Sequence, residues 1–150
     1  MIPPTIHATV VVIGETGLLI RGASGAGKTS LAFALVEAAR RSGIYAAFVA
    51  DDRVALSCAN GRLVARCPET ILGLAERRGH GIEKVDHVPA AVIRLVADLV
   101  AAETITRLPE ITDEETEIEG VKLRRQAIPA RQPDVSLPLL GAALTEMNKI

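Results

Sequence analysis

The sequence is poor in aromatic residues. Its 150 residues include no tryptophan, and the whole aromatic set is Phe33, Tyr45 and Phe48. Proteins that bind single-stranded nucleic acid stack bases on aromatic rings, and so few rings cannot form such a platform. The net charge is −1 and no basic block is present, which also argues against nucleic acid as the main partner. Hydrophobic residues still make up 49% of the chain, so the core must be built from Val, Leu, Ile and Ala.

Cysteine is also scarce, and no long apolar run is present. Cys58 and Cys67 match no metal-binding spacing, and two free thiols are explained most simply by a reducing cytosol. No run of eighteen apolar residues occurs, and the N-terminus lacks a basic region followed by an apolar one. Both observations disfavour membrane-spanning and secreted proteins. The chain shows no internal repeat, low-complexity tract or linker, so we expect one cytoplasmic domain over residues 1–150.

Residues 22–29 carry the clearest motif of the chain. Their sequence, Gly-Ala-Ser-Gly-Ala-Gly-Lys-Thr, fits the phosphate-binding pattern G-x-x-x-x-G-K-[ST]. Glycines let the backbone N–H groups form a concave nest for phosphate oxygens, and the N-terminus of the following helix adds partial positive charge. We expect Lys28 to reach the β- and γ-phosphates of a nucleotide and the Thr29 hydroxyl to ligate Mg²⁺. The predicted nucleotide-binding residues are Gly22, Ala23, Ser24, Gly25, Ala26, Gly27, Lys28 and Thr29.

The residues before the motif predict a hairpin. Residues 8–13 and 18–21 are typical of two strands, joined by a turn at residues 14–17. The phosphate loop therefore leaves a hairpin, whereas in the most familiar phosphate-loop folds it follows a buried parallel strand reached by a crossover. Residues 31–40 predict the helix after the loop, which ends in basic residues and a glycine, as helix C-termini favour.

The remainder of the chain predicts a mixed α/β fold. Residues 46–50 indicate a buried strand, and Asn60-Gly61 is a strong hairpin signal between residues 54–57 and 62–65. Periodicity leaves residues 91–100 open between a strand and a buried helix, and their β-branched content favours a strand. Between the two central stretches we expect a helical turn at 69–75 and a functional loop at 76–82 that runs into a strand near 82–85. An acidic solvated loop at 109–119 should lead into a short edge strand. The chain should then form a strand pair at 121–123 and 126–128 broken by Pro129, a turn-rich connector at 133–138 and a closing helix at 139–147.

Two adjacent carboxylates follow the apolar strand downstream of the phosphate loop. Asp51 and Asp52 are therefore placed where a metal-holding or base carboxylate would lie. Neighbouring residues of a strand point to opposite faces, so we expect one to act on a nucleophile while the other binds metal or braces a turn. A plain polar turn is the alternative. Other candidates are His7 before the first strand, Glu76 as a Mg²⁺ ligand, and Arg77, Arg78 and Arg107 as residues that could neutralise phosphate charge.

Taken together, these stretches resemble a known family. His7, the phosphate loop, residues 49–54, residues 76–82 and residues 107–109 are similar to the catalytic domain of HPr kinase/phosphorylase, the bifunctional bacterial enzyme of the phosphotransferase system. The resemblance covers residues 5–131 and is most specific at residues 76–82, which are similar to the signature E-[IV]-R-G-x-G-I. The short length resembles truncated alphaproteobacterial forms. The implied fold is a phosphate-loop-containing mixed sheet flanked by helices, related to nucleotide-dependent phosphoenolpyruvate carboxykinase.

The resemblance implies a kinase that uses ATP and Mg²⁺ to phosphorylate a serine of an HPr-like phosphocarrier protein. In the reverse direction it implies a phosphorylase that uses inorganic phosphate and releases pyrophosphate. Lys28 would hold the β- and γ-phosphates, Thr29 and Glu76 would bind Mg²⁺, and one aspartate, for which we choose Asp52, would take the serine proton. The implied catalytic set is His7, Lys28, Asp51, Asp52 and Arg107. A homo-oligomer, specifically a hexamer, is implied by the resemblance alone.

Some residues depart from the family pattern. Arg77 replaces an apolar residue of the signature, and His80 replaces a leucine. The family segment V-R-P-G-R-N, associated with dephosphorylation, corresponds here to residues 130–135. In this segment only Arg131 matches in charge, and Asp134 stands in place of the second arginine. The difference weakens the phosphorylase prediction more than the kinase prediction. A nucleotide-sensing module without catalysis and a small-molecule kinase remain as alternatives.

Overall fold

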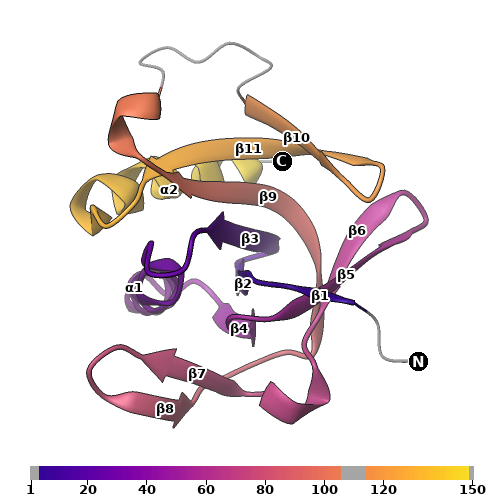
Figure 1. Cartoon of the computed structure of the whole chain (residues 1–150), viewed down its shortest axis with the longest axis horizontal. Coiled ribbons are helices and arrows are strands. Elements are labelled where there is room, and N and C mark those ends of the chain that lie inside the picture. The colour runs from indigo at the N-terminus through magenta and orange to yellow at the C-terminus, as the bar shows by residue number, and fades with distance from the viewer. Residues whose placement is uncertain (1–3, 106–113, 149–150) are drawn as a thin grey trace.

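The computed structural model describes residues 4–105 and 114–148, and these form a mixed α/β fold built on one curled sheet (Figure 1). The elements are β1 (Thr5–Ile6), β2 (Thr9–Ile13), β3 (Thr16–Gly22), α1 (Lys28–Arg41), β4 (Ala46–Ala50), β5 (Val54–Ala59), β6 (Arg62–Arg66), η1 (Glu69–Ile71), β7 (Leu74–Arg77), β8 (Gly81–Lys84), β9 (Ala90–Val100), η2 (Ala102–Thr104), β10 (Glu115–Ile118), β11 (Val121–Pro129) and α2 (Pro133–Met147). The strand order is β1-β5-β6-β9-β3-β2-β4, and β11 pairs with β9 and carries β10. The hairpin of β7 and β8 is a separate small sheet.

The predicted hairpin before the phosphate loop is confirmed. β2 and β3 pair antiparallel, with Thr9 opposite Ile20, and β9 runs parallel to β3 on its other side. At Gly17 a Cβ would lie 2.1 Å from the carbonyl oxygen of Val92, so only glycine lets β9 approach β3 this closely. β3 is therefore a central strand, and it delivers the phosphate loop at its carboxyl end.

The core is aliphatic and lies on both faces of the sheet. Leu18, Ile20 and Leu95 are buried on the face that α1 and α2 cover, while Leu19 and Val96 are buried on the opposite face. Successive residues of a strand point to opposite sides. β3 and β9 therefore contribute side chains to a hydrophobic cluster on each face of the sheet, which explains their uninterrupted apolar sequence.

Four predicted strands are confirmed in this framework. β4 and the β5–β6 hairpin lie where the sequence places them, and β9 shows that residues 91–100 are a strand and not a buried helix. Of the acidic residues 109–119, the first five lie outside the described residues, and β10 forms the expected edge strand against β11. Neither α1 nor α2, nor any other helix among the described residues, is long and apolar enough to cross a membrane.

The C-terminal part differs from the prediction. Residues 121–129 form one continuous strand, which Pro129 ends and does not divide. α2 begins at Pro133 and not at residue 139, so the expected connector at 133–138 is already helical. Proline is well accommodated in the first helical turn, where backbone N–H groups lack intrahelical partners. Pro138 then costs the helix one backbone hydrogen bond without ending it.

The segment after β6 also differs from the prediction. Only Glu69–Ile71 form a helical turn, and the expected loop at 76–82 is largely the hairpin of β7 and β8. Glu76 and Arg77 are the last residues of β7, and the turn that follows uses Gly79 and Gly81 at φ values of 81° and 115°. Glycine was a misleading sign of an irregular loop here, because it serves the left-handed positions of a hairpin turn.

Candidate active site

The phosphate loop connects β3 to α1, and its shape depends on glycines. Gly25 and Gly27 have φ values of 80° and 100°, in the left-handed region that favours glycine. A Cβ on Gly22 would lie 2.9 Å from the Cβ of Leu99, so β9 packs tightly against the first residue of the loop. Gly27 is the N-cap of α1, and the first turn of this fully described helix contains no acidic residue. The backbone N–H groups at this helix end are therefore suited to bind an anion.

Lys28 is held by the loop itself. The residue is only 9% exposed, and its Nζ donates hydrogen bonds to the carbonyl oxygens of Gly22 at 2.8 Å and Ala23 at 3.3 Å. These are neutral acceptors. A phosphate oxygen would give the ammonium group a stronger, charge-assisted hydrogen bond, so the side chain has reason to turn toward a bound phosphate.

Asp51 joins three elements at the carboxyl end of β4. Its carboxylate is 7% exposed and accepts hydrogen bonds from the hydroxyl groups of Thr9 at 3.0 Å and Thr29 at 2.6 Å. Its second oxygen accepts a hydrogen bond from the backbone N–H of Glu76 at 3.0 Å. β2, the start of α1 and β7 are thus tied to one buried carboxylate. Asp51 fixes the position of Thr29 relative to the phosphate loop.

Asp52 is exposed, unlike its buried neighbour Asp51. β4 ends at Ala50, and Asp52 has a φ of 72°, which is unusual for a residue other than glycine. Its side chain is 69% exposed, and its carboxylate lies 3.6 Å from Nδ1 of His7, which is itself 64% exposed. The backbone of Asp52 is fixed to β2, because its carbonyl oxygen accepts a hydrogen bond from the N–H of Ala8 at 3.2 Å. One aspartate is therefore a buried brace, and its neighbour is an exposed carboxylate.

A cavity of about 300 Å³ brings most of the predicted site residues together. It lies between the phosphate loop, the end of β4 and β7. His7 contacts Asp52 without lining this cavity, and Arg107 lies outside the described residues. The described residues contain no group of three or more His, Cys, Asp or Glu side chains arranged to hold a metal. The lining residues are Ser24, Gly25, Gly27, Lys28, Thr29, Ser30, Asp51, Asp52, Glu76 and Arg78.

The two candidate arginines of β7 and its turn behave differently. Arg78 is exposed, lines the cavity, and makes no hydrogen bond or ion pair with any other described residue. Arg77 faces away: its guanidinium donates to Glu83 at 3.0 Å and to Glu37 at 3.0 Å and lies 3.9 Å from the ring centre of Phe33. The hydrogen bonds to Glu83 and then Glu37 raise the pKa of Arg77, and the same bond lowers the pKa of Glu83. Arg77 thus fastens the hairpin to α1, and it is not among the residues that line the phosphate cavity.

A second cavity, of about 240 Å³, adjoins the first and shares Gly25, Gly27, Ser30 and Arg78 with it. It lies between the phosphate loop and the start of α2, and its walls include Leu31, Leu99, Pro129 and Pro133. Sequence reasoning missed it, because the start of α2 was assigned to a connector.

Arg131 is a further residue whose position the sequence does not reveal. Its backbone N–H donates to the carbonyl oxygen of Ala26 at 3.2 Å, and its Nε donates to that of Gly25 at 3.1 Å. Its φ of 58° is again rare outside glycine. The connection between β11 and α2 is therefore hydrogen-bonded to the phosphate loop, although the two are far apart in the sequence. The only available signal was the match in charge to the family segment.

Comparison with known proteins identifies a family that shares this sequence. Residues 3–148 match the model of the HPr serine kinase C-terminal domain. The HPr kinase/phosphorylase of Streptococcus thermophilus is 33% identical over 157 aligned positions, which cover 97% of this chain and 48% of that protein. The corresponding protein of Clostridium perfringens is 27% identical over 146 positions, which cover 87% of this chain and 44% of that protein. The chain thus spans about half the length of these curated relatives.

A solved structure agrees over almost the whole of both chains. The Hpr(Ser) kinase/phosphatase from Coxiella burnetii superimposes with a TM-score of 0.76 at 25% sequence identity, covering 97% of this chain and 99% of that chain. The curled mixed sheet with its helices is therefore the fold of that protein too. Because the family match extends over residues 3–148 and a solved member shares the fold, this chain belongs to the HPr serine kinase C-terminal domain family.

Proposed function

We propose that this protein is a kinase that transfers the γ-phosphoryl group of ATP to a serine of an HPr-like phosphocarrier protein. The observation that carries the proposal is the arrangement around Asp51 and Asp52. A buried carboxylate fixes Thr29 at the phosphate loop, and its neighbour presents an exposed carboxylate at the same cavity. Relatives named HPr kinase/phosphorylase support the choice of substrate.

The phosphate groups of ATP would lie in the cavity of about 300 Å³, over the N–H groups at the start of α1. Lys28 would exchange its carbonyl partners for the β- and γ-phosphates. The donor set suits Mg²⁺, because hard cations prefer oxygen ligands and the Thr29 hydroxyl and Glu76 carboxylate line one cavity. Thr29 donates its proton to Asp51, so its oxygen lone pairs are free to face a cation. Mg²⁺ held there would neutralise charge on the transferred group.

The adenosine part of ATP would occupy the adjoining cavity of about 240 Å³. The walls supplied by Leu31, Leu99, Pro129 and Pro133 are apolar and suit the faces of a base. The two cavities meet at the phosphate loop, so one ligand can extend through both. Arg131, which holds Gly25 and Ala26, would keep the loop in place between them.

Asp52 would accept the proton of the serine hydroxyl as it attacks the γ-phosphorus. A base must reach the acceptor from the open side of the site, and Asp52 is the exposed member of the pair. His7 at 3.6 Å would orient this carboxylate. Arg78 has no competing partner among the described residues and would stabilise charge on the phosphoryl group, a role we also propose for Arg107.

We propose that the phosphorylase direction is the weaker one. Asp134 lies in the first turn of α2, where its negative charge interacts favourably with the helix dipole. The same negative charge would repel the inorganic phosphate that the reverse reaction uses. We also propose that the fold is related to that of phosphoenolpyruvate carboxykinase, that residues 1–150 form one domain, and that the protein is cytoplasmic. A homo-oligomer, specifically a hexamer, is proposed from the family resemblance alone.

The test is a transfer assay. The protein is incubated with ATP, Mg²⁺ and a cognate HPr-like carrier, and phosphoserine is sought on the carrier by mass spectrometry. Asp52→Asn should abolish transfer while ATP binding, measured by calorimetry, is retained. ATP binding without any carrier phosphorylation by the unaltered protein would contradict the proposal and favour a nucleotide-sensing module. Pyrophosphate release from the phosphorylated carrier at millimolar phosphate measures the reverse direction.

A further inference from the structure

The β7–β8 hairpin has two different faces. Residues directly opposite each other in an antiparallel pair share a face, and here Ala75 is opposite Glu83 while Glu76 is opposite Ile82. The face with Ala75, Arg77 and Glu83 packs toward α1, as the contacts of Arg77 with Glu37 and Phe33 show. The other face points away from α1, and Glu76, which lines the phosphate cavity, belongs to it.

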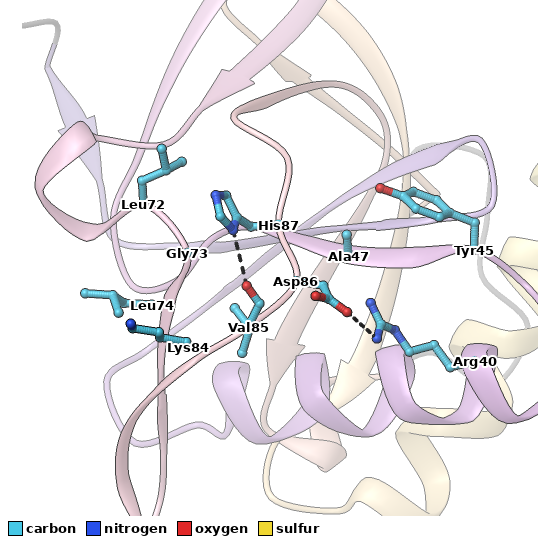
Figure 2. Close-up of a pocket in the computed structure, with 10 residues that line it drawn as sticks. All are labelled: Arg40, Tyr45, Ala47, Leu72, Gly73, Leu74, Lys84, Val85, Asp86 and His87. Carbon is cyan, nitrogen blue, oxygen red and sulfur yellow. Dashed lines mark hydrogen bonds and ion pairs between the residues drawn. The ribbon is translucent and has the colours of Figure 1, made fainter.

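This outer face joins the phosphate cavity to a larger cleft. The next cross-strand pair along the hairpin is Leu74 opposite Lys84, and both line a cleft of about 550 Å³ beside β4 (Figure 2). Adjacent pairs on one face are two residues apart, roughly 7 Å along a strand. Glu76 therefore lines the phosphate cavity, and the neighbouring pair on the same face, Leu74 and Lys84, lines the cleft.

Three exposed apolar side chains lie on the outer face of the hairpin or line the cleft. Ile82 is 71% exposed, and Tyr45 and Leu72, which line the cleft, are 58% and 38% exposed. Several exposed apolar side chains gathered beside a site indicate an interaction surface, whereas scattered ones do not. We call Tyr45, Leu72, Leu74, Ile82 and Lys84 the hairpin surface.

Its charge is positive. Lys84 forms no hydrogen bond or ion pair with any other described residue. The acidic residue of the cleft, Asp86, is already paired with Arg40 at 2.6 Å, as Figure 2 shows. An occupant with an apolar side chain and a carboxylate would therefore complement the hairpin surface.

A large acceptor would cover the exposed side of the phosphate cavity. Asp52 and Glu76 are exposed, so the acceptor must also exclude water from the transferred group. We propose that the hairpin surface is the docking site of the protein that carries the acceptor serine, which rests on the function proposed above. A specific protein complex covers about 800 Å² on each partner, which the phosphate cavity alone cannot supply. The hairpin surface extends that contact area directly from the catalytic carboxylates.

The test compares steady-state kinetics of two variants with matched controls. Ile82→Asp and Lys84→Glu alter the hairpin surface, and both side chains are exposed, so folding should be retained and is checked by thermal denaturation. Val135→Asp and Lys122→Glu make the same changes on α2 and β11, away from it. We expect the KM for the carrier to rise about tenfold or more in the first pair and less than about twofold in the controls. The Kd for ATP should stay within about twofold in all four.

Other results would overturn the inference in distinguishable ways. An unchanged KM for the carrier in Ile82→Asp and Lys84→Glu, with transfer intact, rejects the docking site but leaves the kinase function standing. A change in sedimentation with an unchanged carrier KM would show that a second copy of this chain occupies the surface. An unaltered protein that binds ATP and phosphorylates no carrier rejects the docking site together with the proposed function.

Discussion

The hydroxyl of Thr29 donates a hydrogen bond of 2.6 Å to the buried carboxylate of Asp51. The bond joins the first turn of α1 to the end of β4, two segments that the sequence connects only through a helix and a loop. It sets which lone pairs of the Thr29 oxygen face the cavity. It also supplies a clean chemical test, because threonine, serine and valine differ only in the hydroxyl and methyl groups.

We predict that Thr29→Val raises the Mg²⁺ concentration needed for half-maximal transfer by about tenfold or more, because the proposed oxygen ligand and its hydrogen bond to Asp51 are both lost. Thr29→Ser keeps the hydroxyl and should stay close to the unaltered protein. Mg²⁺ titrations of carrier phosphorylation at fixed ATP check the difference. Equal Mg²⁺ requirements in the two variants would show that Thr29 does not face the cation.

Lys28→Met should reduce kcat/KM for ATP by roughly 10²–10³-fold, because the ammonium group proposed to stabilise phosphate charge is removed. The variant should remain folded, since methionine fills similar space and the hydrogen bonds lost are to two backbone carbonyls of the phosphate loop. Lys122→Met, in β11, is the control for removing a lysine charge. The measurement is carrier phosphorylation under varied ATP, and retention of more than about a tenth of kcat/KM would count against the assigned role.

Gly17→Ala should destabilise the protein by roughly 1–3 kcal/mol, because its Cβ would have to force β9 away from β3. Gly141→Ala is the matched control. Gly141 lies in α2, has no heavy atom within 4 Å of the added Cβ, and should stabilise by about 0.5–1 kcal/mol through helix propensity. Urea denaturation measures both. A neutral Gly17→Ala would mean that the two strands tolerate separation.

The folding stability of the protein should depend on the protonation state of Asp98. Burial alone would raise its pKa, but hydrogen bonds from Arg21 and Arg125 outweigh burial and hold the pKa below its ordinary value of 3.8. A lowered carboxylate pKa contributes stability that is complete above the ordinary value and disappears as pH falls through the folded-state value. Asp98→Asn should therefore be less stable than the unaltered protein at pH 7.

The stability difference between Asp98→Asn and the unaltered protein should shrink steadily as the pH falls below about 4, where the unaltered carboxylate also becomes neutral. Urea denaturation of both proteins across this range gives the comparison. A difference that is the same at pH 7 and at pH 3 would show that the Asp98 carboxylate contributes through its shape and not its charge.

The parts of the fold that local patterns govern could be predicted. The glycine-rich loop, the hairpin before it, the β5–β6 hairpin around Asn60-Gly61 and the position of Asp51 and Asp52 depend on residues close in sequence. These features need only short-range geometry, which propensity and turn chemistry describe well.

The parts that distant contacts govern could not be predicted. Arg77 was weighed as a phosphate ligand, and only packing against Phe33 and Glu37 of α1 reveals that it fastens a hairpin. The sequence predicts a turn-rich connector up to Pro138, although the helix through this residue is stabilised by packing of Leu140 and Leu144 on the sheet. Arg131 reaches Gly25 across 106 positions of sequence. Roles for His7, Lys28, Asp52, Glu76 and Arg107 stay predictions until they are measured.

The central place of β3 has a consequence for biosynthesis. The strand that carries the phosphate loop pairs with β2 at once, but its other neighbour, β9, follows about 75 residues later, and Arg131 later still. A nascent chain that has left the ribosome only through α1 therefore has a nucleotide loop without the strand that packs against Gly22. Nucleotide binding should appear late in translation, after β9 has emerged, so stalled fragments that end before residue 100 should not retain ATP.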